Sequence, residues 1–268
     1  MTTTAASGTD TVADNTDPAW GPTARAWGIF AGIAFATATA VFLVEATGLL
    51  GSSPDYTPTA AGQLIDEAKF FAASFAHQHQ VLWNYVLRDG LFFFAYLALI
   101  ALAIGLREVA GHRRAAPQLA AAFLVVAAIF GCMNAFMTFV QVDYWKNSGW
   151  DQVPAAIMVA VGRDVDLMNG LTRWAGIASY AALAIALYYL GRACRSGGVL
   201  PGWLGVVAYA GAAILVAMIV VSQVDGTDAI SNLLALVIGT VVAPIITIGL
   251  GVHISRAATG TPAPVDGR

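Results

Sequence analysis

Ionisable and amide side chains lie near one end of several otherwise apolar stretches of this sequence. They are Glu45, Asn84, Arg88, Asp89, Gln141, Asp166, Asn169, Arg173, Gln223 and Asn232. A charged or strongly polar group is costly in an apolar environment, so such groups bind a ligand or an ion, or pair with one another. These residues are therefore the first candidates for a functional site.

The spacing of these residues places several of them on shared helical faces. Asn84 and Arg88 are one helical turn apart, and the segment 163–173 carries charged or amide residues at spacings of three, three and four. If both faces point inward, carboxylates lie opposite two arginines in a polar cup at the outer end of the helices. The predicted ligand-binding residues are Glu45, Asn84, Arg88, Asp89, Asp166, Asn169 and Arg173.

A purely structural role is the alternative for the same residues. Arg88 and Arg173 have long side chains that reach a membrane interface, where each can pair with a nearby carboxylate. The nearby carboxylates are those of Glu45, Asp89 and Asp166. Such pairs would tie helices together without binding a ligand, and both interpretations fit the sequence.

Metal, cofactor and covalent chemistry are not expected. His77 and His79 share a side only in an extended segment, because on a helix their side chains diverge by about 200°. Cys132 and Cys194 lack the CxxC spacing of a zinc site or a redox pair. Serine-hydrolase, zincin and phosphate-loop motifs are absent from the sequence. We predict no catalytic residue, no metal site and no cofactor.

The composition predicts the elements that position these residues. The chain has 268 residues, of which 58% are hydrophobic and 11% charged, and its mean hydropathy is +0.71. Soluble domains carry about 25% charged residues. The segments long and apolar enough to cross about 30 Å of hydrocarbon are 27–50, 82–106, 119–142, 171–190, 203–224 and 230–254. Because backbone amides in lipid need internal partners, we predict an all-α polytopic transmembrane bundle of six spans.

Basic residues gather at alternate connections between these spans. They are Arg25, Arg107, His112, Arg113, Arg114, Arg192, Arg195 and Arg256. The other connections are acidic, with Asp55, Asp66, Glu67, Asp143, Asp151, Asp164, Asp166, Asp225 and Asp228 against Lys69, Lys146 and Arg163. Since an excess of arginine and lysine marks the cytoplasmic side, we predict that both termini are cytoplasmic and that the membrane is the bacterial inner (plasma) membrane.

The predicted organisation is a disordered cytoplasmic tail at 1–24, a six-helix transmembrane domain at 25–256 and a second tail at 257–268. The net charge of −3 gives no indication of nucleic-acid binding. The expected partners are the lipid bilayer and a small ligand or another membrane protein.

Two long outer loops contain further helical patterns. The segment 60–76 places Leu64, Ala68, Phe71 and Phe75 on one helical face. The segment 151–165 is similar, with Pro154 suited to a first helical turn. We predict a helix in each loop, which either lies on the outer membrane surface or caps the bundle.

Small residues predict the interior faces of three spans. Gly28, Gly32, Ala36 and Ala40 recur at every fourth position, as do Ala127, Gly131 and Ala135, and then Ala178, Ala182 and Ala186. In the last span, Pro244 predicts a kink, at which the hydroxyl groups of Thr240 and Thr247 bond freed carbonyls.

The segment Val199-Leu200-Pro201-Gly202-Trp203-Leu204-Gly205 follows a short arginine-containing loop. It resembles the start of the fifth helix in multi-pass actinobacterial membrane proteins classed as domains of unknown function. The alanine-rich, lysine-poor composition is similar too. The resemblance implies six helices over residues 25–256, and it implies no reaction and no functional residue.

The sequence is compatible with three functions. The leading hypothesis is a non-catalytic binding or accessory protein that recognises a small ligand, lipid or partner through the polar cup and the two outer loops. A small-solute or ion transporter is the alternative, although it requires polar groups deeper in the spans, where Asn134 is the clearest candidate. A membrane enzyme that uses Glu45, Asp89 or the two histidines is the third.

Overall fold

The computed structural model describes residues 20–47, 49, 64–110, 114–147, 149–196, 200–224 and 228–259. Within these residues the chain is helical and contains no strand. The α-helices are α1 (Trp20–Ala46), α2 (Leu64–Gln80), α3 (Leu82–Ala110), α4 (Ala115–Trp145), α5 (Ala155–Arg195), α6 (Gly202–Val221), α7 (Asp228–Val237) and α8 (Ala243–Ala258). A short 3-10 helix, η1 (Trp150–Gln152), precedes α5, and a π-helical turn, η2 (Ile238–Val242), joins α7 to α8.

Among the described residues, six helices are long and apolar enough to cross a membrane, which confirms the predicted all-α six-span architecture. They are Gly21–Ala46, Leu82–Ala110, Ala115–Trp145, Ala155–Arg195, Gly202–Val221 and Ala229–Ala258. The first and last spans extend beyond the predicted domain boundaries at 25 and 256. Helix α1 begins at Trp20, and α8 ends at Ala258. The rest of the two predicted tails lies outside the described residues.

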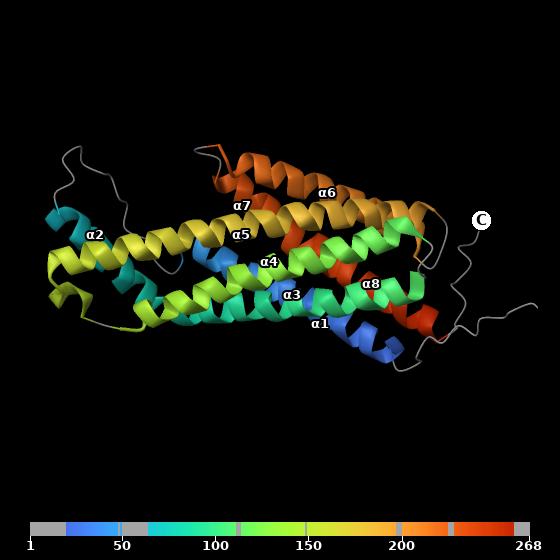
Figure 1. Cartoon of the computed structure of the whole chain (residues 1–268), viewed down its shortest axis with the longest axis horizontal. Coiled ribbons are helices and arrows are strands. Elements are labelled where there is room, and N and C mark those ends of the chain that lie inside the picture. Colours follow the sequence, from blue (N-terminus) through green and yellow to red (C-terminus); the bar gives the residue numbers. More distant parts are fainter. Residues whose placement is uncertain are drawn as a thin grey trace, which may run out of the picture.

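The six spans form an antiparallel bundle in which α1 packs against α8 and α3, α4 packs between α3 and α5, and α6 packs against α5 (Figure 1). One end of the bundle, here called the basic end, carries the described arginines of the predicted cytoplasmic side. They are Arg25, Arg107, Arg114, Arg192, Arg195 and Arg256. The opposite end is called the cap end.

Helix α5 differs from its predicted form. The sequence predicts a separate helix at 151–165 and a span at 171–190, but the structure has one continuous helix of 41 residues. Its length is about 60 Å, twice the thickness of a bilayer's hydrocarbon core. The helix contains no proline after Pro154, so no residue interrupts it before the span begins. Helix α2 packs against the first half of α5 and stabilises this half as a helix. The prediction of a separate helix here is wrong, whereas the predicted alternative of a helix that caps the bundle agrees with the packing of α2 against this half of α5.

The first half of α5 forms a cap with α2, η1 and the last turns of α4, and this cap has its own apolar core. The helix predicted at 60–76 is present as α2, with Phe71 and Phe75 buried and Leu64 exposed; residues 60–63 lie outside the described residues. The Phe71 ring lies directly against Gly162, where a side chain would collide with it. At the surface, Arg163 donates two hydrogen bonds to the Glu67 carboxylate, at 2.9 and 3.0 Å. Helix α2 therefore caps the bundle by packing against α5.

Small residues bring the spans into close contact, as the sequence predicts. A Cβ atom on Gly28 would lie 2.5 Å from the Thr247 carbonyl oxygen and 2.9 Å from the Gly251 Cα, so α1 and α8 touch through their backbones. Ala127, Gly131, Ala135, Ala182 and Ala186 are buried, and Ala36 and Ala178 are half-buried. Ala40 is exposed, because the small-residue face of α1 turns away from its neighbours there.

The sixth span is interrupted before Pro244. Proline has no N–H group, and the chain passes it through the π-helical turn η2, in which the Ala243 N–H donates to the Ile238 carbonyl five residues back. The Thr240 and Thr247 hydroxyl groups donate to the carbonyls of Leu236 and Ala243, at 2.6 and 2.8 Å. Both threonines thus bond backbone carbonyls of their own span.

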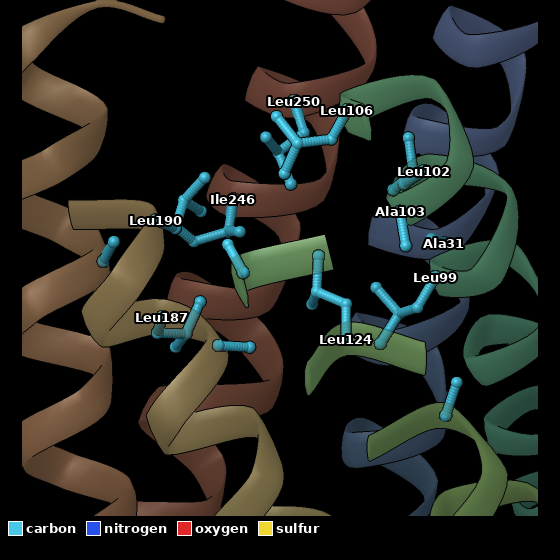
Figure 2. Close-up of a cluster of buried hydrophobic side chains, with 14 of the residues drawn as sticks. Ala31, Leu99, Leu102, Ala103, Leu106, Leu124, Leu187, Leu190, Ile246 and Leu250 are labelled. Atoms are coloured by element: carbon cyan, nitrogen blue, oxygen red, sulfur yellow. The ribbon is translucent and has the colours of Figure 1, made fainter. Parts of the chain in front are cut away.

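The half of the bundle nearer the basic end has a tightly packed apolar interior (Figure 2). Leu102 and Leu106 of α3, Leu190 of α5 and Leu250 of α8 are buried members of one apolar cluster there, in which Leu106 meets Leu250 and Leu190 lies beside Ile246. All four are at most 1% exposed. This layer separates the basic end from the middle of the bundle.

Candidate functional site

Arg88 joins carboxylates from two helices at the cap end of the bundle. Its Nε and Nη2 atoms donate to the two oxygens of Asp89, at 2.9 and 3.0 Å. Its Nη1 atom donates to Glu45 Oε2 of α1 at 2.5 Å. These contacts tie α1 to α3, as the structural interpretation of the sequence predicts for this arginine. The three residues are here called the Arg88 cluster.

The Arg88 cluster is largely withdrawn from the surface. The exposed fractions of its side chains are 14% for Arg88, 23% for Glu45 and 6% for Asp89. With both carboxylates ionised, one guanidinium group faces two negative charges, so the cluster has an excess of negative charge. Tyr85 lies beside it, with the guanidinium carbon 4.8 Å from the ring centroid.

The depth of the cluster follows from helix geometry. Arg88 and Arg107 lie near the two ends of the apolar part of α3, about 28 Å apart along the helix axis. This separation matches the thickness of the hydrocarbon core of a bilayer. The Arg88 cluster therefore lies where the span meets the cap, and α2 and the first half of α5 stand beyond it (Figure 1).

The other predicted site residues on α5 lie apart from the Arg88 cluster. Asp166, Asn169 and Arg173 are exposed. Asn169 Oδ1 accepts a hydrogen bond from Gln141 Nε2 at 3.0 Å, and Arg173 Nη2 donates to the Ser222 carbonyl at 2.7 Å. Within the described residues, no hydrogen bond or ion pair joins them to the cluster. Helix α5 packs on α2, α4 and α6, whereas the cluster lies on α1 and α3, so the predicted single cup is divided.

Two further polar residues, Asn134 and His79, join elements together. Asn134 Nδ2 donates to the Thr172 carbonyl at 2.7 Å and links α4 to α5. His77 and His79 both lie in helix α2, where their side chains diverge, and His79 Nδ1 is 2.8 Å from the Trp145 carbonyl. Asn84 is half-buried in the first turn of α3. The described residues contain no group of three or more metal-binding side chains.

A cavity of about 130 Å³ lies within the bundle, and the residues of the Arg88 cluster are not among those that line it. Its lining comes from α1, α3, α4, α5, α6, α7, η2 and α8, and is mainly apolar. The aromatic lining residues are Phe35, Phe42, Phe92, Tyr96 and Tyr180, and the other hydroxyl groups are those of Thr39 and Thr247. The π-helical turn contributes Ile238, Gly239 and Val242. The break in the sixth span is therefore part of the cavity wall.

Close backbone contacts fix the aromatic rings of the cavity. The Tyr96 ring lies against Gly131, where an added Cβ would come within 2.5 Å of it. The same ring meets Phe35 edge to face, with centroids 5.4 Å apart. Gly239 touches Thr39, so α1 and the π-helical turn are in direct contact. These contacts give the cavity a preformed shape.

The Arg88 cluster lies one helical turn from the cavity along two helices. Phe42 precedes Glu45 by three residues on α1, and Phe92 follows Arg88 by four on α3. Tyr180 lines the cavity and is near enough to Arg88 and Asp89 to interact with their charges. The arrangement is an apolar chamber with a charged group at its cap end and packed leucines at its other end.

Sequence reasoning missed this cavity. Ionisable and amide residues do not indicate it, because the chamber is lined by aromatic and aliphatic groups with a few hydroxyl groups. The feature of the sequence that could have indicated the cavity is the pair Tyr96 and Tyr180. Their hydroxyl groups lie far from the ends of the spans, where a hydroxyl group needs a polar partner.

Comparisons with known proteins give no further assignment, since no protein-family model, curated protein or solved structure matches this chain. The likeness of the segment 199–205 to actinobacterial membrane proteins stays a prediction, and Val199 lies outside the described residues.

Proposed function

We propose that this protein is a non-catalytic binding or accessory protein of the membrane, which holds a small, mainly apolar ligand in the cavity beside the Arg88 cluster. The cavity is the observation that carries this proposal. A dry apolar cavity of about 150 Å³ in another protein binds benzene or xenon, so about 130 Å³ suits a molecule the size of one ring. Sites of this kind are mostly apolar with a few placed polar groups.

The charge of the cluster indicates the polar end of the ligand. Two carboxylates face one guanidinium group, and Arg88 already uses its Nε, Nη1 and Nη2 atoms on them. A positively charged group on the ligand would offset the excess negative charge close to the low-dielectric interior. The proposed ligand is therefore an amphipathic cation with an apolar body of about one ring.

The orientation is part of the same proposal. Arginines occupy the basic end in every connection that the structure describes there, which supports cytoplasmic termini and a place in the bacterial inner membrane. The cap and the Arg88 cluster then face the outside, and the ligand enters from that side.

A small-solute transporter is a second candidate, and the π-helical turn before Pro244 favours it. Broken helices at a binding site are common in transporters. The leucine layer toward the basic end supports the binding protein instead, because it offers no polar path beyond the cavity. Uptake of labelled benzylamine into proteoliposomes, against its own gradient, would favour the transporter.

We expect benzylamine, a one-ring cation at neutral pH, to raise the melting temperature of the purified protein more than uncharged benzyl alcohol does. Replacing Ala235, which lines the cavity, by Phe fills the chamber and abolishes both effects. Glu45→Gln keeps the shape but removes one negative charge, so it reduces the advantage of benzylamine over the alcohol. Differential scanning fluorimetry at millimolar probe concentrations measures these shifts.

Ala40→Phe is the matched control, because Ala40 is exposed on α1 and does not line the cavity. It should retain both shifts. Equal shifts for the two probes in the wild type, or an unchanged response in Ala235→Phe, would contradict the proposed ligand.

A further inference from the structure

A second hollow lies on the outside of the bundle, away from the cavity. It is an open groove along α5 between α4 and α6, lined by Phe123, Tyr188, Tyr189, Tyr209 and small or aliphatic residues. Phe123 and Tyr189 stack with centroids 6.4 Å apart, and Tyr188 meets Tyr209 edge to face at 5.8 Å. Tyrosine carries a hydroxyl group and is enriched at membrane interfaces, so this wall combines an apolar surface with polar tips.

Two arginines stand at the basic-end mouth of the groove. Arg192 follows Tyr188 by one helical turn on the same face of α5 and is exposed. The Arg195 guanidinium carbon lies 4.7 Å above the centroid of the Tyr209 ring. Stacking on a ring leaves the N–H groups at the edge of the guanidinium plane free to bind an anion in a bidentate manner. Within the described residues, no carboxylate forms an ion pair with either arginine.

The groove mouth lies at the level of the lipid headgroups. Helix α6 begins at Gly202 beside the end of α5, and the exposed Trp203 follows at once. An exposed tryptophan at a helix end is typical of the membrane interface. Arg192 and Arg195, in the last turn of α5, are therefore placed where phosphate groups lie, and the tyrosines are placed just below, beside the glycerol esters and the upper acyl chains.

We propose that this groove is a binding site for an anionic phospholipid such as phosphatidylglycerol. The phosphate binds Arg192 and Arg195, and one acyl chain lies along the groove over Tyr188. Complementary charge selects this occupant, because a zwitterionic lipid brings its own cation to the same two arginines. The site is separate from the cavity and does not depend on the ligand proposed there.

Native mass spectrometry of the full chain, released from nanodiscs of phosphatidylcholine with phosphatidylglycerol, tests this site. We expect the wild type to retain phosphatidylglycerol in preference to phosphatidylcholine. The double variant Arg192→Gln/Arg195→Gln should lose this affinity by about ten- to thirtyfold. The control Arg25→Gln/Arg256→Gln removes the same charge from exposed arginines of α1 and α8 at the same end, and should change the affinity by less than about twofold.

Thermal unfolding in phosphatidylcholine alone, equal for all three proteins, confirms that the variants remain folded. Equal retention of both lipids by the wild type, or an equal loss in the control variant, would overturn the proposal. Ile185→Trp narrows the groove and should also reduce lipid retention. If Ile185→Trp instead dissociates a dimer without changing lipid retention, a second copy of the chain occupies the groove, and the lipid proposal is wrong.

Discussion

Replacing Arg88 by Met should destabilise the protein by about 3–5 kcal/mol, the typical cost of removing one partner from a buried ion pair. The change leaves the carboxylates of Glu45 and Asp89 facing each other with no cation between them, and the Asp89 side chain is only 6% exposed. Unfolding of the purified protein, followed by circular dichroism at 222 nm during heating, measures the loss. A melting curve equal to that of the wild type would show that Arg88 does not hold α1 to α3.

A triple variant separates the structural role of the cluster from its proposed binding role. Glu45→Gln, Arg88→Met and Asp89→Asn together remove all three charges at nearly constant volume, and such replacements of buried ion pairs are often close to neutral. We therefore expect the triple variant to recover most of the stability that Arg88→Met loses. Benzylamine and benzyl alcohol should nevertheless raise the melting temperature of the triple variant by similar amounts, because none of the three charges of the cluster remains.

Gly28→Leu should prevent the chain from reaching its folded state. The new Cβ would lie 2.5 Å from the Thr247 carbonyl oxygen and 2.9 Å from the Gly251 Cα. Both atoms belong to the backbone of α8, so no side chain can move aside, and the cost exceeds the roughly 1–3 kcal/mol of ordinary overpacking. Size-exclusion chromatography in detergent, with a fluorescent fusion to the chain, measures the folded yield.

Gly170→Leu is the matched control for this variant, since Gly170 is exposed and a Cβ atom added to it would have no neighbouring atom within 4 Å among the described residues. It adds the same apolar side chain to a helix and should keep the wild-type elution profile. Wild-type yield from Gly28→Leu would contradict the close contact between α1 and α8.

The spans could be predicted from the sequence because membrane crossing depends on local composition. Each apolar run must bond its own backbone amides, so length and hydropathy suffice to identify it. The close contact at Gly28 could also be predicted, because in lipid only small side chains let backbones approach. The pairing of Arg88 with Glu45 and Asp89 could be predicted as one alternative, because a long arginine side chain near the end of a span needs a carboxylate partner.

The continuity of α5 and the internal cavity could not be predicted from the sequence, because both depend on contacts between segments that are distant in the chain. The first half of α5 is stabilised by Phe71 of α2, which is distant in the chain, and that contact requires Gly162 at one position. The cavity is a gap left by side chains from most of the spans, so no single segment encodes it. The predicted site residues have different partners in the structure, because the Arg88 cluster joins α1 to α3 whereas Asn169 and Arg173 of α5 bond to Gln141 and Ser222.

An experimental structure of the wild-type protein with benzylamine tests the central claim most directly. We predict density for the ring between Tyr96, Tyr180 and Met218, with the amine nitrogen directed toward Glu45 and Asp89. A chamber that remains empty at saturating benzylamine, or that is closed by rearranged side chains, would contradict a ligand site beside the Arg88 cluster.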